Sequence, residues 1–148
     1  MTPLALLRLL RIVRLARSRD YRGLRGRGQA WERLAARCLE AEGYKILARN
    51  FRARAGEIDF VAEEGGVLCF VEVKGRSGPG FGSPAEAVTL EKRRRIFRAA
   101  EEYLHRRGVS GPRRCRFDVV SIVEEGARTD VVVLRNAFEE PPPRRRPR

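Results

Sequence analysis

Three acidic side chains and one lysine lie on two short segments that are separated by two glycines. Glu57 and Asp59 belong to the first segment, Glu72 and Lys74 to the second, and Gly65-Gly66 lie between them. Both segments alternate between polar and apolar residues, which is typical of β-strands with one buried face. A Gly-Gly pair between two such strands favours a two-residue turn, because that turn requires positive φ angles. The sequence therefore predicts a hairpin that carries several acids.

The turn fixes which residues face each other across this hairpin. With Gly65-Gly66 in the turn, Asp59 lies opposite Glu72, and Glu57 lies opposite Lys74. Residues two apart share a face, so all four side chains point the same way. Facing carboxylates repel each other unless they share a proton or a cation. The alternative is a solvated face, on which the side chains point into water. The opposite face carries apolar residues: Ile58, Phe60, Cys69, Val71 and Val73.

The spacing Asp–x(12)–Glu–x–Lys resembles the active-site motif of the PD-(D/E)xK nuclease superfamily, with Ile58 in place of the proline. Further motifs in the same order narrow the resemblance to the bacterial YraN-like family of predicted endonucleases, whose fold is similar to archaeal Holliday-junction resolvases. The match covers residues 28–138. Its motifs are Gly28-x-x-Trp31-Glu32, Asn50-Phe51-Arg52, Gly56-Glu57-Ile58-Asp59, Phe70-Val71-Glu72-Val73-Lys74-x-Arg76, Ala87-Val88 followed by Lys92, Arg116-Phe117-Asp118-Val119-Val120 and Asn136-Ala137-Phe138.

This resemblance implies a restriction-endonuclease-like fold and a Mg²⁺- or Mn²⁺-dependent endonuclease that cuts DNA, on branched or repair-intermediate substrates. The residues that it implies for catalysis are Asp59, Glu72, Lys74, Glu32 and Glu57. The implied metal ligands are Asp59, Glu72, the backbone carbonyl of Val73, and Glu32. Lys74 would orient or deprotonate the attacking water or stabilise developing charge, and Glu57 would position Lys74. For Glu32, the alternative is an acid favoured by the start of a helix.

Basic residues after the hairpin are candidates for contact with DNA phosphates: Arg76, Lys92, Arg93 and Arg95. The last three open a predicted helix, next to a glycine- and proline-rich segment at residues 75–84 that we expect to be a mobile loop. The alternative for these residues is a solvated helix face. Asp118 is expected to form a salt bridge with Arg116 or another basic residue.

Most of the positive charge lies in the two ends of the chain. The net charge is +13, of which residues 1–27 carry +7 and residues 141–148 carry +4, which leaves +2 for residues 28–140. Basic ends favour polyanions without sequence preference, although they also serve solubility. We therefore divide the chain into a basic N-terminal extension at 1–27, a nuclease-like domain at 28–138 and a disordered Pro/Arg tail at 139–148. No apolar run in the extension approaches the ~18 residues of a membrane-spanning helix. Its role stays open between a nucleic-acid arm, a membrane-surface contact, a packing helix and a mis-set start codon.

The remaining pattern predicts the order α-β-β-β-α-β-β. Helical periodicity covers residues 29–42, with Gly43 as the stop, and a second helix runs from a cap at Thr89 to residue 107. Strands are expected at residues 44–52, in the hairpin, at 115–123 and at 130–135. A chain of 148 residues suits one domain. The predicted fold class is α/β, with a central mixed sheet of about five strands flanked by helices.

The cysteines indicate a compartment. Cys38, Cys69 and Cys115 are widely spaced in apolar segments, which predicts buried thiols in the reducing cytoplasm of a bacterium, where association with the nucleoid is an open option. DNA is the expected partner, and a homodimer is expected only by analogy. Two other classes stay open: a nucleic-acid-binding protein that keeps the nuclease fold without catalysis, and a membrane-surface or partner-binding adaptor.

Overall fold

Both predicted helices are present, with ends that lie within two residues of the predicted ones. The computed structural model of the protein describes residues 10–16, 27–77, 88–109, 113–142 and 144. Helix α2 comprises Arg27–Ala41, and helix α3 comprises Leu90–Arg106. Gly43, with a φ of 91°, follows the end of α2. Thr89 caps α3, because its hydroxyl accepts a hydrogen bond from the Lys92 amide at 3.2 Å.

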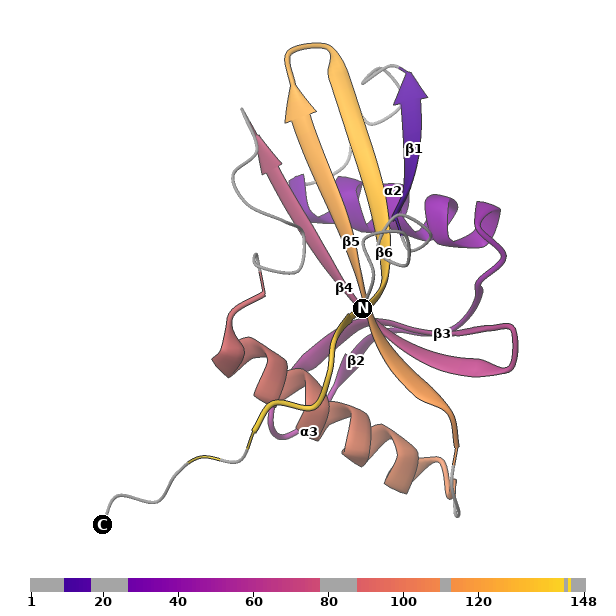
Figure 1. Ribbon diagram of the computed structural model, residues 1–148, viewed down its shortest axis with the longest axis vertical. Helices are drawn as coiled ribbons and strands as arrows, with labels where there is room; N and C mark the ends of the chain where they lie inside the picture. Colours follow the sequence, from indigo (N-terminus) through magenta and orange to yellow (C-terminus); the bar gives the residue numbers. More distant parts are fainter. Residues whose placement is uncertain (1–9, 17–26, 78–87, 110–112, 143, 145–148) are drawn as a thin grey trace, which may run out of the picture.

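The strands form one mixed sheet (Figure 1). They are β1 (Leu10–Ala16), β2 (Lys45–Arg52), β3 (Glu57–Glu64), β4 (Val67–Ser77), β5 (Cys115–Glu125) and β6 (Arg128–Phe138). Their order in the sheet is β1-β6-β5-β4-β3-β2, with β4 and β5 parallel and the other neighbours antiparallel. From α2 onwards the element order is the predicted α-β-β-β-α-β-β, so the predicted α/β fold class is confirmed.

The N-terminal extension contributes a sixth strand that the sequence analysis did not foresee. Each of the seven residues of β1 pairs with a residue of β6, from Leu10 with Leu134 to Ala16 with Arg128. A packing helix is therefore wrong for residues 10–16, and the rest of residues 1–26 lies outside the described part of the chain. Within the described residues, neither helix has the length and apolar character needed to cross a bilayer.

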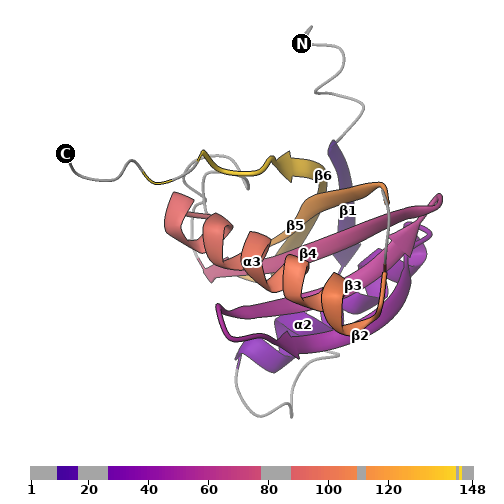
Figure 2. The ribbon, with the colours of Figure 1, turned by 90° about the horizontal axis from the view of Figure 1, so that it is seen from below.

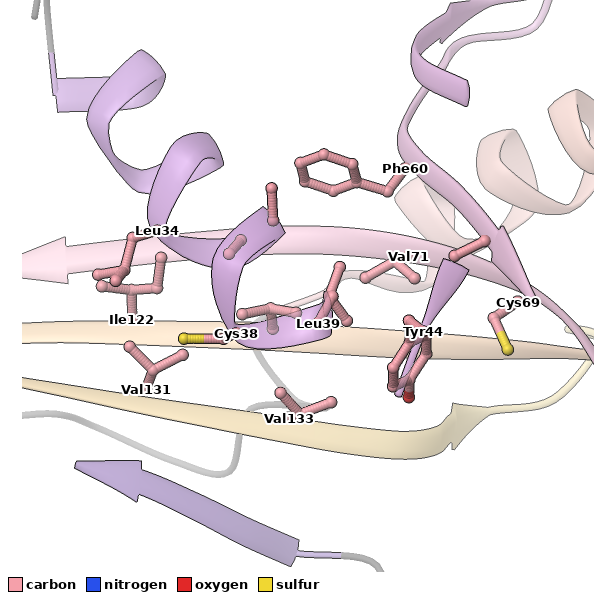
Figure 3. Close-up of a cluster of buried hydrophobic side chains, with 14 residues drawn as sticks. Leu34, Cys38, Leu39, Tyr44, Phe60, Cys69, Val71, Ile122, Val131 and Val133 are labelled. Carbon is pink, nitrogen blue, oxygen red and sulfur yellow. The ribbon is translucent and has the colours of Figure 1, made fainter. Parts of the chain in front are cut away.

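Two apolar clusters join the sheet to the helices, which lie on opposite faces of the sheet (Figure 2). Figure 3 shows the cluster beneath α2, where helix residues meet side chains from four strands: Leu34, Cys38 and Leu39 with Phe60, Val71, Ile122, Val131 and Val133. The cluster beneath α3 has a different set of strand residues: Ile58, Val61, Leu68, Phe70, Phe117 and Val119. Both faces of the central strands are therefore buried, which explains their nearly continuous apolar sequences.

The hairpin between β3 and β4 has the predicted turn. Gly65 and Gly66 have φ angles of 57° and 77°, as a two-residue turn requires. The backbone pairing then runs from Glu64 opposite Val67 to Phe60 opposite Val71.

Beyond Phe60 the two strands separate, so the predicted facing pairs lie outside the ladder. Strand β3 continues beside β2, where Ile58 pairs with Phe51 and Glu57 pairs with Arg52. Strand β4 continues beside β5 as far as Ser77. Figure 1 shows the same divergence, with β4 running on beside β5 and β2 lying with β3. Counted from the turn, Asp59 is the first residue of β3 that no longer pairs with β4.

The separation also changes which face the side chains of β3 occupy. Phe60 lies in the cluster beneath α2, whereas Ile58 lies in the cluster beneath α3. The prediction that both share one face is therefore wrong. Two irregularities of the neighbouring strand β2 accompany this change: its register against β3 shifts between Ile46 and Ala48, and Asn50 has a positive φ of 49°. Such an irregularity bends a strand and increases its local twist.

Strand β4 is fixed to α2 by a contact that leaves no room for a side chain. Gly75 lies in β4 rather than in the loop that we predicted to begin there, since it pairs with Ile122. A Cβ atom on Gly75 would lie 1.9 Å from Cε3 of Trp31. The indole Nε1 of Trp31 also donates a hydrogen bond to Glu124 Oε1 at 3.0 Å. Trp31 therefore joins α2 to both β4 and β5. Its contact with β4 is at Gly75, the residue that follows Lys74.

One of the three predicted buried thiols is exposed. Cys38 and Cys69 are buried, and burial raises the pKa of Cys38 to about 11 and of Cys69 to about 12. Cys115 begins β5 and is exposed, so the prediction is wrong for this residue. Continuous burial starts only at Phe117, the third residue of this strand, which is why apolar neighbours misled the prediction.

The described part of the C-terminal tail, residues 139–142 and 144, has no regular secondary structure. It contacts α3, because Arg94 Nη2 donates a hydrogen bond to the Pro142 carbonyl at 3.3 Å, and Arg144 forms an ion pair with Glu91. Both contacts are exposed, so their contribution to stability is small.

We predict that Gly75→Ala lowers the free energy of unfolding by about 2–3 kcal/mol, because the added methyl group would overlap the Trp31 ring. Urea unfolding followed by circular dichroism measures this. Gly28→Ala is the matched control: no atom lies within 4 Å of a Cβ at that position in α2, so stability should stay the same or rise slightly. Equal stability of the Gly75→Ala variant and the wild-type protein would contradict the contact.

Candidate active site

The separation of β3 from β4 brings two carboxylates together. The backbone amide of Val73 on β4 points toward the place that β3 has left, and Asp59 Oδ2 accepts its hydrogen bond at 2.7 Å. This bond holds the Asp59 side chain against β4, next to Glu72. We call Asp59 and Glu72 the acid pair. The sequence predicted this proximity from strand pairing, but the structure achieves it through a side chain that replaces the pairing.

Glu72 is in an unfavourable environment for a negative charge. It is 5% exposed, and its Oε2 atom has no hydrogen-bond partner. Burial and the negative charge of Asp59 raise the pKa of Glu72 to about 7, while Lys92 and, less strongly, Lys74 oppose the shift. A buried carboxylate oxygen without a partner costs free energy when the group is ionised, and proteins keep such groups mainly at functional sites.

The acid pair fits a hard divalent cation. Carboxylate oxygens are the ligands that Mg²⁺ and Mn²⁺ prefer, and the unpartnered Glu72 Oε2 is a free ligand atom. Among the described residues, no group of three or more His, Cys, Asp or Glu side chains could hold a metal ion. A site of two carboxylates, completed by the Val73 carbonyl and water, still suits Mg²⁺, which usually keeps several of its water molecules.

The two other predicted acids have different neighbours. Glu32 is the sixth residue of α2, and no acid lies in the first turn, so the interpretation as an acid favoured by the helix start is wrong. Asn50 Nδ2 donates a hydrogen bond to Glu32 Oε2 at 3.5 Å, which places this acid beside the distortion in β2. Glu57 lies opposite Arg52 at the end of β3, and no described contact joins it to Lys74.

Lys74 shares a face of β4 with Glu72. Residues two apart on a strand point the same way, so Glu72, Lys74 and Arg76 follow one another along one face. Lys74 is partly exposed and has no ion-pair partner among the described residues. Its ammonium group is therefore available to a water molecule or a substrate beside the acid pair.

The predicted phosphate-binding residues divide into two groups. Lys92 reaches the acid pair, with its Nζ 3.5 Å from Glu72 Oε1, and Arg95 is exposed on α3 beside Gly56. Arg76 is partly exposed on the same face of β4 as Lys74. Arg93 instead serves the fold: its Nε donates a hydrogen bond to the Val88 carbonyl at 2.9 Å, and its guanidinium lies over the Phe138 ring.

A buried polar network that the sequence analysis foresaw only in part lies near the start of β5, where Asp118 pairs with Val71. Asp118 is fully buried and accepts hydrogen bonds from Arg116 Nε at 3.0 Å, Tyr44 Oη at 2.7 Å and the Asn136 amide at 2.8 Å. The predicted Asp118–Arg116 pair is confirmed. Burial and the charge of Asp118 raise the pKa of Tyr44. Tyr44 was missed because its partner is 74 residues away, and no local pattern signals such a contact.

Glu64 extends this network to the hairpin. Arg116 pairs with Glu64, and Arg135 Nε lies 3.4 Å from the same carboxylate. Each carboxylate here has a cationic partner, unlike Glu72 Oε2. The network therefore satisfies its own charges and ties β3, β5 and β6 together, which makes it part of the framework rather than a second reactive site.

A cavity of about 330 Å³ lies between α3 and the ends of β5 and β6. Its walls include Phe97, Phe117 and Phe138, and no member of the acid pair lines it. The candidate active site is therefore separate from this cavity.

Comparisons with known proteins find relatives that match about three quarters of this chain and nearly their own full length. A profile of the uncharacterised protein family UPF0102 matches residues 31–122, which include every member of the acid pair and Lys74. A UPF0102 protein of Symbiobacterium thermophilum is 54% identical over 113 residues, which are 75% of this chain and 94% of that protein. A UPF0102 protein of Moorella thermoacetica is 50% identical, over 77% of this chain and 96% of that protein. A UPF0102 protein of Rhodococcus jostii is 49% identical, over 75% of this chain and 94% of that protein.

We predict that Glu72→Gln stabilises the metal-free protein by about 1–2 kcal/mol at pH 8, because it removes a buried charge with an unpartnered oxygen. Urea unfolding in the presence of EDTA measures this. The matched control is Glu64→Gln, which removes a carboxylate paired with two arginines and should destabilise the protein. A loss of stability in Glu72→Gln as large as in Glu64→Gln would show that Glu72 is a structural ion-pair residue.

Proposed function

Because this chain belongs to the UPF0102 family, a name that carries no activity, we propose its function from the site: a metal-dependent endonuclease that hydrolyses DNA phosphodiester bonds. Branched or repair-intermediate DNA is the proposed substrate. The observation that carries the proposal is the environment of Glu72, a buried carboxylate held beside Asp59 with one oxygen unpartnered. A divalent cation would turn this costly arrangement into a favourable one.

The acid pair and the carbonyl of Val73 would hold a Mg²⁺ or Mn²⁺ ion. When bound, such an ion lowers the pKa of a coordinated water and neutralises charge on the phosphate. The protein supplies the rigid placement of its ligands: the Val73 amide fixes the Asp59 carboxylate, and Trp31 fixes β4 directly after Lys74. Glu32 would contribute through Asn50 or through water rather than as a member of the pair.

Lys74 would act on the attacking water or on the phosphate. Its side chain follows Glu72 on the same face of β4 and has no ion-pair partner among the described residues. An ammonium group at this place can orient the attacking water or donate a proton to the leaving oxygen. It can also stabilise the negative charge that develops on the phosphate. In the described part of the chain Lys74 has no ion-pair partner, which leaves its ammonium group available for any of these roles.

The basic residues around the acid pair would receive the DNA backbone. Arg76 continues the row of Glu72 and Lys74, and Arg95 is exposed on α3. The ends of the chain add charge, because residues 1–27 carry +7 and residues 141–148 carry +4. Such charge strengthens binding to DNA without sequence preference and makes it sensitive to salt. This agrees with a substrate that is recognised by its shape.

A second candidate is a nucleic-acid-binding protein that keeps the fold without turnover. The observation in its favour is that Glu32 lies with Asn50, so the described residues bring only two acids together. The unpartnered oxygen of Glu72 argues against it, because a protein that only binds has no use for this costly group. Self-association stays a prediction, which sedimentation with and without four-way-junction DNA tests.

We predict that the full chain cuts at least one substrate in a screen of duplex, flap, single-stranded and four-way-junction DNA, and only with Mg²⁺ or Mn²⁺. Lys74→Ala should lower the rate by roughly 10²–10⁴-fold, the range expected for the loss of a positioned acid, base or charge. Gel analysis of end-labelled substrates measures both effects, and circular dichroism verifies that the variant is folded.

The matched control is Arg37→Ala, which removes an exposed cation from α2, away from the acid pair. This variant should cut at the wild-type rate. A folded Lys74→Ala variant that cuts as fast as the wild type would refute the assignment. Tight, salt-sensitive DNA binding without cleavage of any substrate would favour the second candidate.

A further inference from the structure

Lys92 joins α3 to the acid pair from the other side of the site. It lies in the first turn of α3, which Thr89 caps, and its Nζ is 3.5 Å from Glu72 Oε1. The Lys92 side chain is 35% exposed, whereas that of Glu72 is 6% exposed. The Lys92 side chain therefore reaches from a partly exposed helix end to a buried carboxylate.

Lys92 is the cation that balances Glu72. Lys74 is on the same strand face but is not within ion-pair distance of either acid among the described contacts. The neighbouring arginines have other partners, because Arg93 binds the Val88 carbonyl and Arg94 binds Glu91 and the Pro142 carbonyl. The described residues thus provide one ion pair for the buried carboxylate, and Lys92 forms it.

This ion pair is suited to exchange. Its 3.5 Å separation is longer than the roughly 2.7–2.9 Å of a strong charge-assisted hydrogen bond. It also satisfies one carboxylate oxygen only, since Glu72 Oε2 has no partner. A lysine has a flexible stem and a strongly hydrated head, so it moves to a new anionic partner with little loss. An arginine with two parallel hydrogen bonds would hold the carboxylate more firmly.

We propose that Lys92 is the resident counter-ion of the acid pair, that a divalent metal displaces it from Glu72, and that it then binds a phosphate of the DNA. This inference rests on the proposed nuclease function and assigns Lys92 a role that differs from that of Lys74. The exchange keeps the buried acids neutralised before metal binds, and it turns the same lysine into a substrate contact afterwards. Lys92 is thus a positioning residue for both metal and DNA.

The first test needs no metal and no activity. In EDTA at pH 8, Lys92→Ala should lower the melting temperature by about 2–6 °C, because Glu72 loses its counter-ion. In the Glu72→Gln background the same substitution should change it by less than about 1 °C, since no charge remains to balance. Equal effects in both backgrounds would show that the ion pair does not form, and the proposal would be overturned.

The second test measures the exchange itself. Titration with Mn²⁺, followed by electron paramagnetic resonance of the free ion, should show about 3–10-fold tighter binding to Lys92→Ala, because no lysine competes for Glu72. With Ca²⁺ in place of Mn²⁺, the same variant should bind four-way-junction DNA several-fold more weakly, with a salt slope smaller by about one. Lys45→Ala, which removes an exposed lysine of β2, should change neither value.

Lys92→Ala is expected to strengthen the binding of Mn²⁺ and to weaken the binding of DNA. These opposite signs separate the counter-ion role from a purely structural role of Lys92. If the wild type binds Mn²⁺ but Lys92→Ala binds it equally or more weakly, the counter-ion role is wrong and the proposed function stands. If wild-type uptake of Mn²⁺ does not depend on Asp59 and Glu72, the proposed function fails, and the exchange fails with it.

Discussion

The divergence of β3 from β4 at Asp59 is the constraint on which the site depends. In two paired strands, the backbone N–H groups of one strand donate hydrogen bonds to the carbonyl oxygens of the other. No backbone donor is then left for a side chain. Where the pairing stops, the amide of Val73 needs another acceptor, and Asp59 provides it at 2.7 Å. This one hydrogen bond forces a second carboxylate against the buried Glu72. The chemistry that the site can perform follows from this position, because two acids held together in a partly buried place favour a cation over water.

The rest of the fold keeps this opening in place. On one side, β4 cannot move toward β3, because ten of its residues pair in parallel with β5, and Trp31 fills the space over Gly75. On the other side, β3 follows β2, whose backbone is distorted at Asn50. The Asp118 network anchors the first half of β5 with charges that are paired. Stability and reactivity are thus separated: the framework acids have partners, whereas Glu72 is left with an unpartnered oxygen.

Local patterns in the sequence were sufficient for the elements and for part of the site. The glycine turn at residues 65–66, the Thr89 cap and the order of the elements depend on neighbouring residues, and each is confirmed. The alternation of polar and apolar residues identified Asp59, Glu72 and Lys74 as a group. It also misplaced Ile58, because strict alternation assumes an undistorted strand that stays paired with its neighbour, whereas β3 leaves β4 beyond Phe60. Long-range contacts were invisible: nothing near Lys92 indicates that it reaches Glu72, and nothing near residues 10–16 indicates a pairing with β6.

The central claim is that the acid pair is a metal site, and the most direct measurement is a crystal structure of the wild-type chain with Mn²⁺, using the anomalous signal of manganese to locate the ion. The account predicts a peak within about 2.0–2.3 Å of one oxygen each of Asp59 and Glu72. It also predicts that Lys92 has left Glu72 in that structure. A peak elsewhere, or no peak at the acid pair when the crystal holds excess manganese, would contradict the account.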